Sequence, residues 1–84
     1  MAKLTLAEMK AKTNPKSYFW SEDTMRFYSG AKYYAKYSKK TNTNFIMMTQ
    51  NVPEVGNRTA WWSFDEKTGH YNSINEAYLP PDVR

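Results

Sequence analysis

The fold is decided by residues 58–74, which read RTAWWSFDEKTGHYNSI. Within residues 58–64, Ala60, Trp62 and Phe64 recur at every second position, which is the period of a strand with one buried face. Residues 65–69 have the composition of a hairpin turn, and Gly69 suits a left-handed backbone position. Residues 70–74 then predict the returning strand. This hairpin indicates an antiparallel sheet.

Two further strands are predicted before the hairpin. Residues 45–49 form one of them, and residues 53–57, which contain a proline and a glycine, connect it to the next. Residues 31–38 alternate Ala or Tyr with Lys, Tyr or Ser, the pattern of a half-buried strand. A helix is the rival interpretation of residues 31–38, because Ala and Lys are good helix formers. We expect the polar run 38–44 to be a loop.

A short helix is predicted over residues 6–13. Thr5 and Glu8 have the spacing of a capping box, and Leu4 and Met9 occupy the two positions of a hydrophobic staple. Pro15 ends the helix, because the residue before a proline is disfavoured in the helical conformation.

A second helix is predicted over residues 22–29, with Ser21 as its N-cap and Gly30 as its end. The fold class is therefore α+β, with two short N-terminal helices followed by a three- or four-stranded antiparallel β-meander whose one face the helices cover. Residues 1–84 form one small domain, and we expect residues 76–84 to be a loose C-terminal tail.

Composition limits the class of protein. Aromatic residues make up 17% of the 84 residues, so we expect an aromatic rather than an aliphatic core. The chain has no cysteine and therefore no disulfide, and it has neither an apolar run typical of a signal peptide nor a membrane span. We expect a cytoplasmic protein with no membrane partner.

The sequence predicts no enzyme. His70 is the only histidine, and its neighbours Asp65 and Glu66 fit an ordinary solvated turn better than an acid–base site. One imidazole and no thiol make a poor zinc site, and the three glycines lie too far apart for a phosphate loop. We therefore expect no catalytic residue, no metal and no cofactor.

Residues 32–40 combine lysines with tyrosines and carry no acid. In a strand, Lys32, Tyr34 and Lys36 would project from one face, with Lys39 and Lys40 following in the loop. Single-stranded nucleic acid is commonly bound by aromatic side chains that stack on bases and lysines that contact phosphates. Alternatively, Tyr33 and Tyr37 belong to the core and the lysines protect an edge strand from aggregation.

Trp61 and Trp62 would point to opposite faces of a regular strand. The helices cover one of them, and the other needs cover from the tail, a second copy of the chain or a partner protein. Exposed tryptophans are favoured anchors at protein interfaces. The alternative without a partner places Tyr78 and Leu79 of the tail across this face.

Residues 18–28, YFWSEDTMRFY, resemble a signature of small uncharacterised proteins encoded by bacteriophages and related mobile elements. The turn sequence FDEKTG of residues 64–69 matches the same group. The resemblance implies an accessory role in the bacterial cytoplasm during infection, and it supplies no catalytic residue. Arg26, within the signature, would contact a partner, although an ion pair with Glu22 is the ordinary alternative.

These observations leave two functional hypotheses. The first is a non-enzymatic phage accessory protein that binds and modulates a host protein through Trp61, Trp62 and Arg26. The second is a small nucleic-acid-binding protein that uses residues 32–40. The resemblance and the modest net charge of +4 favour the first. A homodimer is compatible with either.

Overall fold

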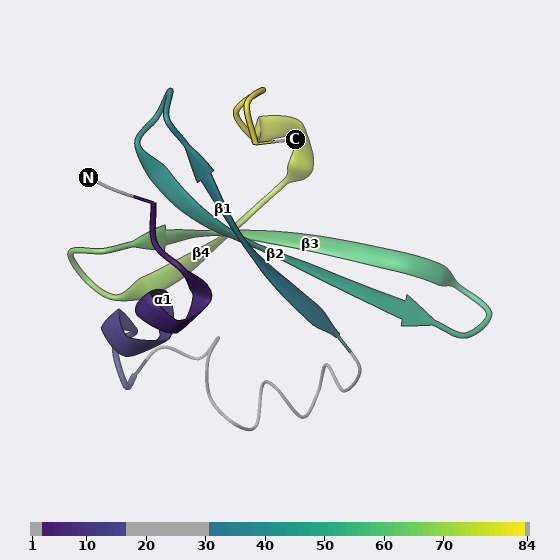
Figure 1. The fold of residues 1–84 in the computed structure, drawn as a ribbon. Coiled ribbons are helices and arrows are strands. Elements are labelled where there is room, and N and C mark those ends of the chain that lie inside the picture. Colours follow the sequence, from purple (N-terminus) through teal and green to yellow (C-terminus); the bar gives the residue numbers. More distant parts are fainter. Residues whose placement is uncertain (1–2, 17–30, 84) are drawn as a thin grey trace.

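The computed structural model describes residues 3–16 and 31–83 (Figure 1). Helix α1 (Leu6–Lys12) precedes four strands and a short 3₁₀ helix. The strands are β1 (Lys32–Ser38), β2 (Thr43–Val52), β3 (Gly56–Asp65) and β4 (His70–Ile74), and the 3₁₀ helix is η1 (Glu76–Tyr78). The predicted α+β class and antiparallel sheet are confirmed. The prediction of two N-terminal helices is not, because the described residues hold one α-helix and residues 22–29 lie outside them.

The four strands follow one another across the sheet in the order β1-β2-β3-β4, each antiparallel to its neighbour. Residues 32–38 form a strand, so the helical interpretation of this segment was wrong. Strands β2 and β3 are longer than predicted, because their pairing continues to Val52 and Gly56. The turn between them is tight, with positive φ angles of 73° at Glu54 and 96° at Gly56.

Helix α1 begins at the predicted capping box. The Thr5 hydroxyl accepts a hydrogen bond from the Glu8 amide at 3.1 Å, and the Glu8 carboxylate accepts one from the Thr5 amide at 3.0 Å. The backbone hydrogen bond from Thr5, followed by the one with its side chain, lowers the pKa of Glu8 below its ordinary value. The helix packs on one face of the sheet, where buried Leu4 and Met9 contact Ile46 and Phe64.

Hydrogen bonds at both ends fix α1 and its flanks to the sheet. The buried Asn44 side chain accepts a hydrogen bond from the Leu4 amide at 2.9 Å. At the other end, the Asn14 amide donates to the carbonyl of Gly69 at 2.9 Å. Gly69 has a φ of 74°, as its place in the predicted turn requires.

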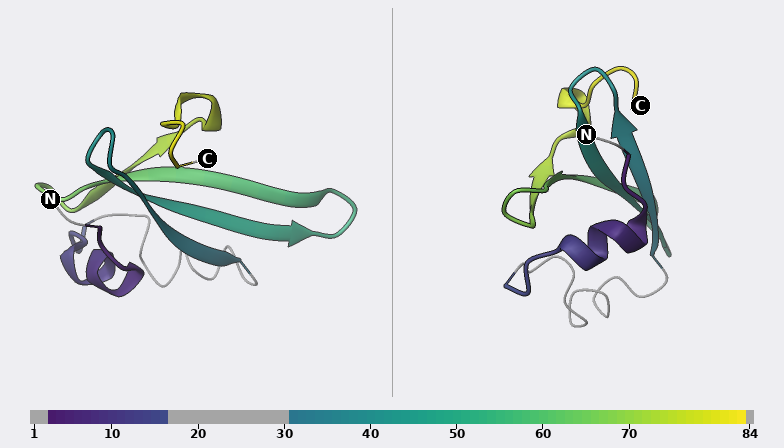
Figure 2. Two further views of the ribbon diagram at one scale, coloured as in Figure 1. Left: turned by 45° about the horizontal axis from the view of Figure 1, so that its top comes forward. Right: turned by 60° about the vertical axis from the view of Figure 1, so that its left-hand side comes forward.

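The opposite face of the sheet is covered by residues 76–83 (Figure 2). Leu79 and Val83 are buried there against Phe45 and Trp61. The expectation of a loose tail is therefore corrected for residues 76–83. Their apolar side chains, four residues apart, cover strand residues that would otherwise be bare, and the Asn75 side chain caps η1 by accepting a hydrogen bond from the Ala77 amide.

Candidate nucleic-acid interface

Strand β1 places Lys32, Tyr34 and Lys36 on one face of the sheet, and we call these three residues the basic strip. Their partners across the strand pair are, in the same order, Thr49, Met47 and Phe45. Because Phe45 contacts Leu79 and Val83, the basic strip lies on the face that residues 76–83 partly cover. The strand pairing thus places the three side chains on a common face, as the sequence predicts.

The basic strip is accessible to a ligand. Tyr34 is 42% exposed, Lys32 is exposed and Lys36 is half-buried. Within the part of the chain that the structure describes, no ion pair involves either lysine, whereas Lys12 pairs with Glu66 at 3.3 Å. Both charges of the strip are therefore available to an anionic partner.

The neighbouring tyrosines of β1 have structural roles. Tyr33 packs against the cluster formed by α1 and the sheet. The Tyr37 hydroxyl donates a hydrogen bond to the Asn42 side chain at 2.6 Å, within the β1–β2 turn. Tyr33 is thus part of the core, as the alternative interpretation predicts, whereas Tyr34 is exposed.

Lys39 and Lys40 are exposed in the turn that follows β1, and an acid of the tail lies beside them. The Asp82 carboxylate accepts hydrogen bonds from the Ser38 hydroxyl at 2.9 Å and from the Lys40 amide at 3.4 Å. Burial raises the pKa of Asp82, but the hydrogen bonds from Ser38 and from the turn amides together lower it below its ordinary value. Lys39 and Lys40 are thus less favourable for an anion than the basic strip.

The face of the basic strip continues along the outer part of the β2–β3 hairpin, where both strands are longer than the sequence predicted. Residues 50–58, here called the β-arm, extend beyond the ends of β1 and β4 (Figure 2). Thr49, Thr59, Asn51 and Asn57 carry the same face of the sheet outward from the strip. By the strand register, no Asp or Glu lies on this face between Lys36 and the arm tip among the described residues. Polar residues at strand ends resemble loops, so only the pairing of β2 with β3 could have revealed the arm.

The two tryptophans of β3 point to opposite faces, as predicted. Trp61 is only 5% exposed beneath Leu79 and Val83, and its buried indole N–H has no hydrogen-bond partner among the described residues. Trp62 is half-buried in the cluster beneath α1. Arg26 lies outside the described residues. The three predicted protein-contact residues are therefore not brought together on an exposed surface in the part of the chain described.

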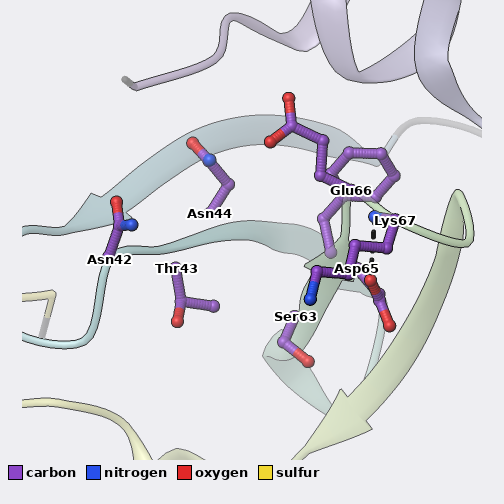
Figure 3. A pocket seen from close by; sticks show the side chains of 8 residues that line it. Asn42, Thr43, Asn44, Ser63, Asp65, Glu66 and Lys67 are labelled. Atoms are coloured by element: carbon purple, nitrogen blue, oxygen red, sulfur yellow. Dashed lines mark hydrogen bonds between the residues drawn. The ribbon is translucent and has the colours of Figure 1, made fainter. Parts of the chain in front are cut away.

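A shallow depression of about 460 Å³ lies where β2 begins and β3 ends (Figure 3). Several of its polar groups already have partners. The Asp65 carboxylate accepts a hydrogen bond from the Lys67 amide at 2.9 Å, Glu66 pairs with Lys12, and Asn44 binds the Leu4 amide. His70 is exposed nearby, at the start of β4. These polar groups therefore serve contacts within the turn and with α1, and they do not indicate a ligand site.

Within residues 3–16 and 31–83, no three side chains of His, Cys, Asp or Glu converge as metal ligands. The described helices are all too short to cross a membrane.

Comparison of the chain with models of protein families, with curated proteins and with solved structures finds no match in any of the three.

Proposed function

We propose that this protein binds single-stranded nucleic acid through the basic strip. The observation that carries the proposal is Tyr34, 42% exposed on the sheet face between two lysines that form no ion pair among the described residues. An exposed aromatic ring offers a stacking surface to a base of any sequence, and flanking ammonium groups attract the phosphates on either side. The net charge of +4 is consistent with an anionic ligand of this kind.

The geometry favours this function over a protein partner bound through tryptophan. A partner that used Trp61 would first have to displace Leu79 and Val83 from it. A partner that used Trp62 would have to disturb the cluster beneath α1. The basic strip needs neither rearrangement. The phage origin and host-protein role implied by residues 18–28 stay predictions, since residues 17–30 lie outside the described residues.

The test is fluorescence anisotropy with short labelled single-stranded DNA and RNA, at low and at near-physiological salt. We expect Tyr34→Ala to weaken binding about tenfold and Tyr34→Phe to leave it nearly unchanged, because stacking needs the ring and not the hydroxyl. In Lys32→Gln/Lys36→Gln the dependence of log K on log salt should fall by about 0.7 for each phosphate that the strip no longer neutralises.

The matched control is Lys3→Gln/Lys16→Gln, which removes the same charge from two exposed lysines that flank α1. We expect this control to retain most of the affinity. The proposal is overturned if the protein binds no single strand even at low salt. It is overturned equally if the control weakens binding as much as the strip variant does, since that result would indicate attraction by net charge alone.

A further inference from the structure

The β-arm presents two asparagines side by side. Beyond the pairs Lys32–Thr49 and Trp61–Ile74, β2 and β3 continue as a two-stranded ribbon that the described parts of β1 and β4 do not flank. In this ribbon Asn51 and Asn57 are direct cross-strand partners. Side chains of directly opposite residues stand about 5 Å apart on the same face. The two amides therefore form one pair.

The amide pair has no structural role in the described part of the molecule. Asn51 and Asn57 are both exposed. None of the hydrogen bonds between described residues uses either side-chain amide, in contrast to Asn14, Asn42, Asn44 and Asn75, whose side chains each make at least one. Each amide of the pair is thus available as a donor and an acceptor.

The amide pair also lies on the face of the basic strip. Asn51 is six residues beyond Phe45, the partner of Lys36, so the pair stands about 20 Å from Lys36 along the sheet. Thr49 and Thr59 lie between the amides and Tyr34, on a stretch of this face where the described strands carry no acid. A strand of nucleic acid whose base stacks on Tyr34 and whose phosphates meet Lys32 can continue over the threonines to the arm.

We propose that the Asn51–Asn57 pair selects adenine in the bound strand, an inference that rests on the proposed function. An asparagine amide matches an adjacent donor and acceptor, and its two-bond contact with the N6 and N7 atoms of adenine is the standard one. Unstacked bases in single strands expose both their Watson–Crick and Hoogsteen edges. Adenine offers a donor–acceptor pair on each edge, whereas the Hoogsteen edge of guanine offers two acceptors and a pyrimidine offers one such edge.

The experiment compares labelled thymine oligonucleotides in which two adjacent central positions are left unchanged or are replaced by adenine, guanine or cytosine. We expect the wild-type protein to bind the adenine strand about tenfold more tightly than the thymine strand. Asn51→Thr/Asn57→Thr should abolish this preference and change the affinity for the thymine strand less than about twofold. Threonine is chosen because it favours strands and keeps the arm paired, which circular dichroism checks.

The matched control is Arg58→Gln, because Arg58 lies on the arm face opposite the two asparagines. Its loss of charge lowers all affinities together and leaves the ratio of adenine to thymine strands unchanged. The inference is overturned if wild type binds all four strands equally, prefers another base, or keeps its adenine preference without the two asparagines. In each of these cases the proposed function stands, whereas failure of wild type to bind any strand overturns the proposed function itself.

Discussion

Gly69 joins the β3–β4 turn to the end of α1 at closer range than any side chain permits. A Cβ atom at this position would lie 2.6 Å from the Asn14 nitrogen and 2.7 Å from the Lys12 oxygen, and the φ of 74° disfavours any other residue. Both neighbouring atoms belong to the backbone, so neither can yield by a rotamer change. The helix and the turn can therefore pack this closely only because residue 69 has no side chain.

We expect Gly69→Ala to lower the free energy of unfolding by about 2–4 kcal/mol, measured by urea denaturation. The control is Gly56→Ala, which shares a positive φ but has no atom within 4 Å of the added methyl group. This control should cost only about 1–2 kcal/mol. Equal losses in the two variants would show that backbone conformation, and not the contact with α1, sets the requirement for glycine.

Among the elements, α1 depends on its cap, because a helix of seven residues is too short to be stable alone. Thr5→Ala removes the hydroxyl that accepts from the Glu8 amide, and we expect a decrease of about 1 kcal/mol in unfolding free energy. Thr5→Ser keeps the acceptor and should lose much less. Denaturation of both variants would test this, and an equal decrease would assign the effect to the methyl group of Thr5.

Residues 76–83 depend on a carboxylate for their attachment to the β1–β2 turn. Because folding lowers the pKa of Asp82, the stabilisation it gives is complete above its unfolded value of about 4 and is lost as the pH falls through the lower folded value. We expect the tryptophan fluorescence emission to shift to longer wavelength over this acid range, because residues 76–83 detach and Trp61 becomes exposed to solvent. The shift should shrink in Asp82→Asn and persist in Glu8→Gln, because Glu8 also has a lowered pKa but lies away from residues 76–83. A full shift in Asp82→Asn would contradict this role.

At the scale of the whole molecule, the sheet separates two hydrophobic clusters that share no residue. Ile46 belongs to the cluster beneath α1, and Val83 belongs to the cluster beneath residues 76–83. We expect the decreases in unfolding free energy from Ile46→Val and Val83→Ala to add within about 0.5 kcal/mol. Leu79→Ala and Val83→Ala lie in one cluster and should not add. Coupling of Ile46 with Val83 would show that the sheet transmits packing between its faces.

The sequence predicted best where the pattern was local. Residues 58–74 alternate strongly enough to define a hairpin, and the alternation of Lys32, Tyr34 and Lys36 was enough to place them together. The ends of β2 and β3 were missed because Asn44, Gln50 and Asn57 are polar. Their strand conformation comes from the pairing of β2 with β3. Of the two tail residues considered as cover for this sheet face, Leu79 is buried there and Tyr78 is exposed. Val83 was missed as a core residue because two prolines separate it from Leu79 and no period marks it; only the bare sheet face beneath explains its burial.

Because the strands are arranged in the sheet in the order in which they occur in the chain, each newly made strand meets its partner as it leaves the ribosome. The sheet can thus be assembled from its first edge without rearrangement. Residues 76–83 follow all four strands in the chain, so Phe45 and Trp61 remain open to water or to a chaperone until this segment docks. A chain that ended just after β4 would form a finished sheet with one bare apolar face, the form of this protein most prone to aggregate.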